Sequence, residues 1–411
     1  MSSQMLKIFQ SSQINDTRHL KDINYKFIRW LNTTITKEMK KITYVFINGR
    51  IKNIKENTVE SQEFYYGSLF LKSQGLDVHI IEFNENSVRN STLLKLFDKI
   101  LSKYFSLPFY TSKVTSLKNL KVFLKTTDLF LISESAGFSV LPMLVITKLF
   151  RKVNVNLFVM GLYSKHLRYP KLKIFHKMFI KILNFFVDNL LFLGKGELEK
   201  AIRIDSKIKE KSVYFPWCVD GEFWKVSDDS KAKSKEKILF VGNDGNRDDV
   251  LLTEIAKRLP QYSFIFVTNI LKLVDLKLEN VEIIQGQWGK NFLTDLELKD
   301  IYSSARISII PLKESSQPSG QSVALQSMSQ GVPVMISDTK GFWDRDTLID
   351  KKHLILVKDN NAQEWTEQIE RLYKSKEELE TISQNALEVT KSKFSMKNFN
   401  NQISELISDQ N

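Results

Sequence analysis

Short apolar runs alternate with longer segments along most of the chain, and this alternation constrains the fold more than any other feature. The first half has apolar runs at 41–47, 76–83, 126–135, 153–161 and 189–193. The segment 60–75 between the first two runs has helical periodicity and ends at Gly75. Buried strands that alternate with helices form parallel sheets. The sequence therefore predicts an α/β protein built from Rossmann-like βαβ units.

A second series of the same kind begins at residue 237. Strands are predicted at 237–243, 262–269, 280–288, 306–312, 332–338 and 353–359, and helices at 249–260, 294–305, 320–331 and 362–395. The aromatic stretch 215–224 and the polar stretch 227–237 separate the two series and predict an interdomain linker.

The length supports two domains, because 411 residues are too many for one ordinary hydrophobic core. We expect two Rossmann-like domains that face a cleft, at 41–222 and 223–394. An extension at 1–40 precedes them, and a C-terminal helix at 395–411 is expected to pack back on the first domain.

Composition and cysteine usage bear on the compartment. Apolar residues make up 42% of the chain and charged residues 26%, as in ordinary globular proteins. The single cysteine, Cys218, cannot form an internal disulfide, which fits a reducing compartment. No secretory h-region is present at the N-terminus, and no apolar run is long enough to cross a bilayer. These features predict a cytoplasmic protein.

The net charge of +13 is concentrated in the first half of the chain. Residues 151–211 carry 14 basic and 5 acidic side chains, and residues 1–40 carry 7 and 3. A local basic surface favours an anionic partner such as membrane lipid, an acidic acceptor or nucleic acid, and a solvated basic face is the alternative. No nucleic-acid-binding motif accompanies the charge, which argues against nucleic acid.

Residues 171–186 form the clearest amphipathic helix in the sequence. Its apolar residues recur every three or four positions at Phe175, Phe179, Ile182 and Phe186. Its lysines follow one another at i, i+4 spacing at Lys173, Lys177 and Lys181. Such a helix can face an anionic membrane and place the protein peripherally at the inner membrane surface. The alternative is a core-facing helix with a solvated lysine face.

The stretch 306–337 has the pattern of a phosphate-binding loop. A buried strand ends at Pro311, and a polar loop follows up to Gly320. A helix then begins near Gln321 or Ser322. The small residues Ser319 and Gly320 allow the backbone to approach a ligand, which then meets the first amides of the helix and the positive end of its dipole.

This stretch resembles the donor-site signature of the family-4 or group 1 glycosyltransferases, which have the GT-B fold. SMSQGVPVMIS (327–337) matches the end of that signature. FPWCVDGEFW (215–224) resembles the family's segment before its second domain, and ILFVGNDGNRDD (238–249) resembles the first strand and phosphate-binding loop of that domain.

The resemblance implies an activity. It implies transfer of a sugar from a nucleotide-diphosphate donor to a glycan, lipid-linked or small acceptor, in glycan or cell-surface polysaccharide biosynthesis. It further implies retention of the anomeric configuration, with no divalent metal and no cofactor beyond the donor substrate. The first domain is then expected to bind the acceptor, and the second domain the nucleotide sugar.

The resemblance also implies donor-binding residues in the second domain. The candidates are Gly242, Asn243, Arg247, Trp288, Ser319, Gly320, Gln321, Ser322 and Gln326. The family's two acidic positions hold Pro318 and Gln326 here, so that a glutamine oxygen would have to accept the ribose hydroxyls. Trp288 lies where family members hold the base, and a core tryptophan is the alternative.

Two residues are candidate catalytic groups. Arg247 follows the Gly242 turn, where family members carry a basic residue that neutralises the leaving diphosphate. His166 follows the strand at 153–161, several residues later than the family histidine that contacts the donor sugar, so that a surface histidine is the alternative. On the acceptor side the candidates are Asn48, Gly49 and Ser135, which follow predicted strands.

The missing acidic pair leaves a second hypothesis open. A GT-B protein without catalytic activity would act as a partner or scaffold. Arg247 and the Ser319-Gly320 loop favour the enzyme, whereas Pro318 and Gln326 favour the silent protein.

Overall fold

The computed structural model describes residues 40–47, 49–83, 92–165, 167–226, 235–285 and 293–408. The chain divides into two units, residues 1–40 and 41–411, and the description that follows concerns the second. The extension predicted at 1–40 lies outside the described residues except for Lys40. Among the helices described, none is long and apolar enough to cross a membrane.

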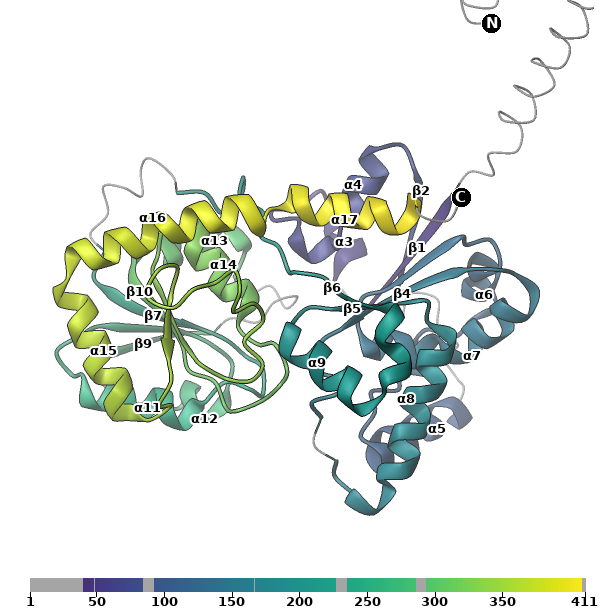
Figure 1. Cartoon of the computed structure of the whole chain (residues 1–411), viewed down its shortest axis with the longest axis horizontal. Coiled ribbons are helices and arrows are strands. Elements are labelled where there is room, and N and C mark those ends of the chain that lie inside the picture. Colours follow the sequence, from purple (N-terminus) through teal and green to yellow (C-terminus); the bar gives the residue numbers. More distant parts are fainter. Residues whose placement is uncertain are drawn as a thin grey trace, which may run out of the picture. The chain divides into compact units, whose positions relative to one another are not determined.

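Two parallel six-stranded sheets form the frame of residues 41–411 (Figure 1). The first has the strand order β2-β1-β3-β4-β5-β6, and the second has the order β12-β11-β10-β7-β8-β9. The strands are β1 Lys41–Phe46, β2 Asp77–Glu82, β3 Asp128–Leu131, β4 Asn154–Val159, β5 Asn189–Phe192, β6 Ser212–Tyr214, β7 Lys237–Val241, β8 Phe264–Val267, β9 Val281–Ile284, β10 Ala305–Ile310, β11 Val334–Ser337 and β12 Ile355–Val357. The predicted α/β architecture with two Rossmann-like domains is confirmed.

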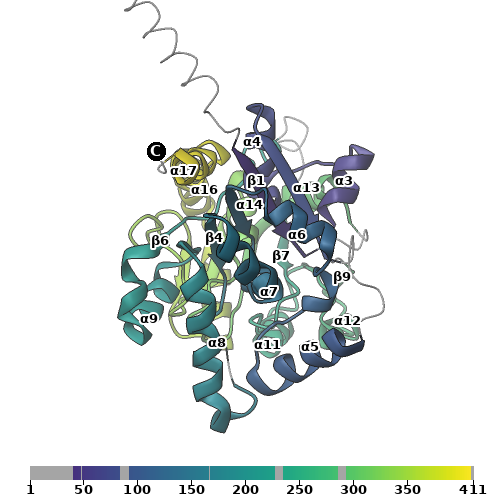
Figure 2. The same ribbon diagram turned by 90° about the vertical axis from the view of Figure 1, so that its right-hand side faces the viewer.

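Helices cover both faces of each sheet, which buries the central strands on both sides (Figures 1 and 2). Strands in such a position appear in the sequence as continuous apolar runs, as in β3 and β8, where every residue is buried. The helices are α3 Arg50–Glu56, α4 Ser68–Ser73, α5 Thr92–Phe105, α6 Leu117–Phe123, α7 Glu134–Phe150, α8 Lys173–Phe186, α9 Lys195–Ile204, α11 Asp249–Arg258, α12 Leu271–Val274, α13 Asp295–Ser304, α14 Gln321–Ser329, α15 Ala362–Lys374, α16 Lys376–Lys393 and α17 Met396–Ser408.

The helix predicted over 60–75 is interrupted in the structure. A short 3-10 helix, η1 (Glu63–Tyr65), is separated from α4 by Tyr66 and Gly67, which have φ angles of 52° and 78°. A helix cannot continue through such left-handed residues. A Cβ atom at Gly67 would also lie 3.2 Å from side-chain atoms of α17, so that this turn allows α17 to pack closely.

The C-terminal helix α17 packs on the first domain although α16 lies beside α14 of the second (Figure 1). Phe399 of α17 lies 5.0 Å from Phe215 and 6.0 Å from Trp217 between ring centroids. Where the chain returns, the Val219 amide donates to the Phe394 carbonyl at 2.9 Å. The two passages of the chain between the sheets therefore run side by side.

Candidate active site

Two loops of the second domain are joined at the carboxyl ends of neighbouring strands. The loop after β7 and the loop after β10 exchange backbone hydrogen bonds, from Lys313 N to Asn246 O at 2.8 Å and from Asp248 N to Pro311 O at 3.0 Å. The Asn246 amide also donates to the Ser319 hydroxyl at 2.7 Å. Because β7 and β10 are adjacent in the sheet, the fold brings together two segments that lie about 70 residues apart.

Arg247 points inward from the first of these loops and is buried. Its Nη1 lies 3.4 Å from Asp244, yet Nε and Nη1 make no hydrogen bond within the described part of the chain. Burial lowers the pKa of this guanidinium. Burying a cation lowers the free energy of unfolding when its N–H groups have no hydrogen-bond acceptor. An anion with several oxygen atoms would accept hydrogen bonds from these N–H groups.

Glycines make room for this guanidinium. A Cβ atom at Gly242 would lie 2.1 Å from Arg247 Nε, and one at Gly320 would lie 3.4 Å from Nη1. Gly320 has a φ of 80° and forms the N-cap of α14 without any capping side chain. The start of a nine-residue helix therefore lies next to the buried cation. The predicted residues Gly242, Arg247, Ser319 and Gly320 form one cluster.

The remaining donor-site candidates of the second domain are spread around this cluster. Ser322 is half-buried in the first turn of α14, and Asn243 is exposed and accepts from the Asn269 amide at 2.5 Å. Gln321 is turned to the first domain, where its amide donates to the Leu193 carbonyl at 2.7 Å. Pro318, at the first of the family's acidic positions, lies against Gly194, whose Cβ would come within 2.9 Å of it.

Gln326 is buried, and both the oxygen and the nitrogen of its side-chain amide form hydrogen bonds. Its oxygen accepts from the Tyr302 hydroxyl at 3.2 Å, and its nitrogen donates to Glu63 at 3.0 Å. Gln326 is thus directed at the first domain rather than at open space. A ribose contact by Gln326 stays a prediction, and it requires this network to open.

Glu63 of η1 is the buried acid that the sequence did not indicate. Its Oε1 accepts from Trp224 Nε1 at 2.8 Å as well as from Gln326, and its Oε2 makes no hydrogen bond to any described residue. Burial, which outweighs these hydrogen bonds, raises the pKa of Glu63 to about 7. A buried carboxyl group from the other domain therefore lies next to position 326.

Consecutive residues of the segment that ends at Glu63 are hydrogen bonded to the start of α13 in the second domain and to the predicted linker. Glu60 accepts from the Leu296 amide at 3.0 Å, and the Ser61 hydroxyl donates to Asp295 at 2.5 Å. The Gln62 amide donates to Asp220 at 3.1 Å. We call residues 60–63 the interdomain strap. The strap holds the start of α13 against the first domain.

The loops after β10 and β11 also contact the first domain. Cβ atoms at Gly161 and Gly196 would lie 2.5 Å from Gln317 and 2.0 Å from the Lys340 carbonyl. Nearby, Lys195 Nζ lies 2.5 Å from Asp344 and 2.7 Å from Asp346. Glycines after β4 and β5 therefore let the carboxyl ends of the two sheets approach each other closely.

Of the residues predicted to face the acceptor, Gly49 lines an interdomain cleft of about 580 Å³. The cleft lies between α3 and the start of α13, with Lys52, Ser61 and Asp295 among its walls. Gly49 has a φ of 87°, and a Cβ atom there would meet open space. Ser135 lies in the first turn of α7, half-buried, and its carbonyl accepts from Ser139 at 2.6 Å.

Two buried carboxyl groups follow β3 and β5 of the first domain. Glu197 accepts from the Gly161 and Tyr163 amides at 2.8 and 3.0 Å. Burial and the neighbouring Glu134 raise the pKa of Glu197 to about 8. Glu134 itself pairs with Lys165 at 3.6 Å. No local sequence signal predicts this pair, because it is the fold that brings the starts of α7 and α9 together.

Three predicted site residues, Asn48, His166 and Trp288, lie outside the described residues. Lys173, Lys177 and Lys181 lie on α8 and are exposed.

Comparison with known sequences finds one family match, which lies in the second half of the chain. Residues 235–375 match the family described as Glycosyl transferases group 1. This range is therefore similar in sequence to a group 1 glycosyltransferase domain. The matched range contains the cluster of Gly242, Arg247, Ser319 and Gly320. No curated protein matches the chain in sequence.

Solved structures extend the likeness to both domains. HepE from Anabaena in complex with UDP-glucose aligns with a TM-score of 0.64 and 13% identity over 90% of this chain and 99% of that one. Sucrose-phosphate synthase from Thermosynechococcus elongatus gives 0.64 and 15% over 90% and 98%. A glycosyltransferase from Rickettsia africae gives 0.59 and 13% over 90% and 99%. At these identities the likeness shows the fold alone, which is the GT-B fold.

Proposed function

We propose that this protein transfers a sugar from a nucleoside-diphosphate donor to a glycan, lipid-linked or small acceptor, in glycan or cell-surface polysaccharide biosynthesis. The buried guanidinium of Arg247 is the observation that carries the proposal. Its unfilled Nε and Nη1 lie within the group 1 domain beside Gly242 and Gly320. A planar guanidinium binds two phosphate oxygens at once, so that a diphosphate satisfies this group better than a single carboxylate does.

The chemistry follows from this placement. As the bond between the sugar and the diphosphate breaks, negative charge gathers on the leaving phosphate. Arg247 and the first amides of α14 stabilise that charge in a buried site that is already arranged for it. Transfer with retention, in which the leaving phosphate takes the acceptor proton, follows from the resemblance to the family. The positive loop and the helix start then do the work that a divalent metal does elsewhere.

The first candidate donors are uridine-diphosphate sugars. HepE, which shares this fold, has been solved with UDP-glucose. On the acceptor side we assign Gly49 and Ser135, together with the interdomain cleft that Gly49 lines. Donor and acceptor would then meet at the carboxyl ends of both sheets, where open α/β sheets bind their ligands.

Donor binding is tested by thermal stabilisation with UDP, GDP, ADP and dTDP. One of these should raise the melting temperature, because a ligand that binds only the folded protein stabilises it. The corresponding nucleotide sugars are then screened for slow hydrolysis. Hydrolysis is expected to continue in the presence of EDTA. Loss of hydrolysis in EDTA that Mg²⁺ or Mn²⁺ restores would overturn the metal-independent mechanism.

Arg247→Ala tests the mechanism itself. It should lose most turnover and most of the nucleotide-induced stabilisation, and should remain folded because it removes a buried cation with unfilled N–H groups. Arg258→Ala, at the exposed end of α11, is the matched control. Unchanged turnover in Arg247→Ala would remove this residue from the mechanism.

A catalytically silent partner or scaffold protein is the second candidate function. Two observations favour it. Pro318 packs against Gly194, and the Gln326 side-chain amide already forms hydrogen bonds through both its oxygen and its nitrogen. This reading predicts that no nucleotide sugar is hydrolysed, and it is favoured if no nucleoside diphosphate shifts the melting temperature. Hydrolysis of any nucleotide sugar excludes it, whereas a shift in melting temperature alone does not, because a protein without activity can still bind the nucleotide.

A further inference from the structure

Helix α8 exposes apolar side chains on the side opposite its core contacts. His176, Ile180 and Leu183 are buried against the first domain. On the opposite side, Ile174 is 78% exposed and Phe185 is 79% exposed. This differs from a core-facing helix with a solvated lysine face, because the face that points away from the core is itself apolar.

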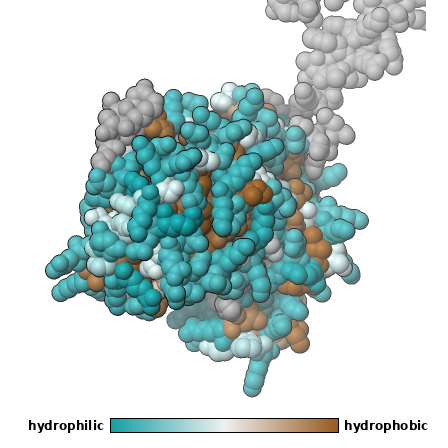
Figure 3. Space-filling view, turned by 60° about the vertical axis from the view of Figure 1, so that its left-hand side comes forward, coloured by the Kyte–Doolittle hydropathy of each residue, from teal (hydrophilic) through white to brown (hydrophobic). Residues whose placement is uncertain are grey.

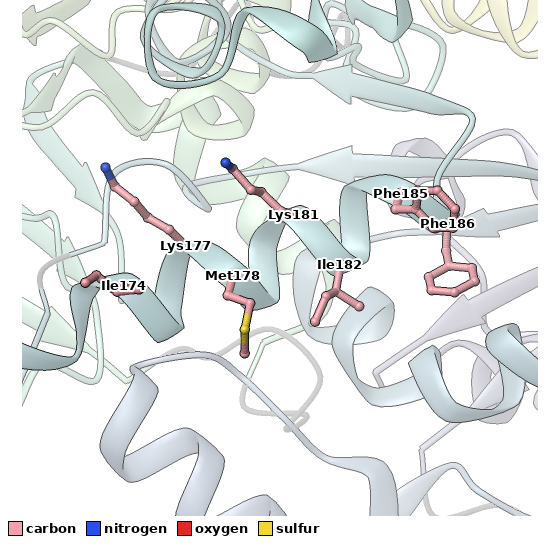
Figure 4. A pocket seen from close by; sticks show the side chains of 7 residues that line it. All are labelled: Ile174, Lys177, Met178, Lys181, Ile182, Phe185 and Phe186. Carbon is pink, nitrogen blue, oxygen red and sulfur yellow. The ribbon is translucent and has the colours of Figure 1, made fainter.

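The lysines of α8 flank this apolar face. Figure 4 shows Lys177 and Lys181 extending to one side of the helix, with Met178 and Ile182 pointing to the other. These side chains line a shallow groove of about 490 Å³. Neither lysine forms an ion pair with a carboxylate of the described residues. No acidic residue lies within α8.

Helix α5 repeats the arrangement. Its exposed apolar side chains lie on one side of the helix and are Leu93, Leu96, Phe97, Ile100 and Tyr104, of which Leu93 is 81% exposed. Three exposed lysines follow at i, i+4 spacing, at Lys95, Lys99 and Lys103. The single acid of α5, Asp98, is buried and accepts from the Thr111 and Ser112 amides at 2.8 Å. The exposed charge of α5 is therefore positive.

The two helices are neighbours. Phe105 at the end of α5 lies 5.8 Å from Phe175 and 5.2 Å from Phe179 between ring centroids. His176 Nδ1 lies 2.6 Å from the Phe105 carbonyl. Both helices lie in the same lobe of the first domain in Figures 1 and 2.

The end of α7 adds a third apolar group next to α8. Leu149 and Phe150 are both about three-quarters exposed. Lys148 pairs at 2.8 Å with Asp188, which follows α8 directly. In the space-filling view, brown apolar side chains are scattered over the face shown, and several lie along its lower and right-hand edges (Figure 3).

We propose that α5, α8 and the end of α7 form a surface that binds an anionic lipid bilayer. We call it the lipid-binding face. Exposed Leu, Ile and Phe side chains enter the boundary between headgroups and acyl chains, and the lysines reach back to the anionic headgroups. The positive charge of both helices without an exposed acid selects an anionic partner. Apolar groups spread over three helices match an extended bilayer better than they match a single peptide in a groove.

Flotation of the full-length protein with vesicles tests the proposal without any activity assay, so that its outcome is independent of the proposed sugar transfer. We expect binding to vesicles of phosphatidylcholine mixed with phosphatidylglycerol and much weaker binding to phosphatidylcholine alone. Each lysine near an anionic surface contributes about fivefold to binding, so that Lys173→Gln, Lys177→Gln and Lys181→Gln together should weaken it on the order of a hundredfold. Lys391→Gln, Lys393→Gln and Lys397→Gln change the net charge equally on the C-terminal helices and should leave binding unchanged.

Insertion of the apolar side chains is tested with a site-specific probe. Cys218 is the single cysteine and is buried, so a new surface cysteine can be labelled selectively with a polarity-sensitive fluorophore. A label at Phe185→Cys or Leu93→Cys should shift to the blue on addition of anionic vesicles. A label at Val250→Cys, on the exposed side of α11, should not.

Three results would overturn the proposal. The first is equal binding to neutral and anionic vesicles, and the second is no binding to either. The third is that the control variant of Lys391, Lys393 and Lys397 loses as much binding as the α8 variant does. Concentration-dependent self-association without lipid, abolished by Phe185→Ser, would assign the face to a second copy of the chain instead.

Discussion

Replacing Glu63 by glutamine should favour the stability of the folded protein more at alkaline pH than at acidic pH. Glu63 is buried between Trp224 and Gln326, and burial raises its pKa to about 7 from the ordinary 4.5. The folded protein therefore holds this proton more tightly than the unfolded chain does, and the free energy of unfolding falls as the pH rises from about 4.5 to above 7. At 1.36 kcal/mol per pKa unit, the carboxylate costs about 3 kcal/mol near pH 8 and less than about 1 kcal/mol near pH 5.

Glutamine keeps the hydrogen bonds but cannot ionise. Its carbonyl can accept from Trp224 and Gln326, as Glu63 Oε1 does, and its amide nitrogen takes the place of Oε2, which has no hydrogen-bond partner among the described residues. Any cost of that nitrogen is the same at both pH values. The stability difference between Glu63→Gln and wild type should therefore change by roughly 2 to 3 kcal/mol between about pH 5 and pH 8, in favour of the variant at pH 8.

Urea unfolding followed by tryptophan fluorescence measures this difference at the two pH values. Glu222→Gln is the matched control, because it removes an exposed carboxylate two residues from Trp224. An exposed charge contributes little to stability, so its difference should stay near zero. A Glu63→Gln stability difference that is the same at both pH values would show that Glu63 is not a buried proton-holding group.

Three further substitutions test the surroundings of Glu63, the start of α14 and the contact between the two domains. Trp224→Phe removes a hydrogen bond that lowers the pKa of Glu63, so the loss of stability relative to wild type should be larger at about pH 8 than at pH 5 in urea unfolding. Gly320→Ala places a Cβ atom 2.8 Å from Ile310 Cγ2 at a φ of 80° and should lower the free energy of unfolding by about 2 kcal/mol. Gly196→Ala would bring a Cβ atom to 2.0 Å from the Lys340 carbonyl and should separate the two domains, which would increase the radius of gyration in X-ray scattering. Gly221→Ala is the control and should leave the radius of gyration unchanged, because a Cβ atom there has no atom of the described residues within 4 Å. An unchanged scattering curve for Gly196→Ala would show that the domains do not need this contact.

Local sequence patterns were enough to predict every strand of the two sheets except β6, and also the loop that precedes α14. The apolar runs are continuous because strands covered by helices on both faces are buried on both sides. The small residues Ser319 and Gly320 predicted a close backbone approach, and the structure shows why glycine is needed there: a left-handed φ and a guanidinium beside it. The same patterns predicted one helix at 60–75, where the left-handed Tyr66 interrupts it.

The partners of the buried groups were beyond the reach of such patterns. Position 326 was recognised as a family acid replaced by glutamine, but its carboxyl neighbour, Glu63, lies 263 residues away. Such a pairing depends on how the two domains pack, and no periodicity of one segment encodes it. The same holds for α8. Its sequence shows apolar residues and lysines at helical spacing. Only the structure shows that the core-facing side of α8 is the one that carries His176, Ile180 and Leu183. The sequence therefore determined which strands and helices form, because burial on one or two faces fixes the spacing of apolar residues. The tertiary structure alone decided which buried charges meet and which apolar faces remain in contact with solvent, because both depend on surfaces supplied by distant parts of the chain.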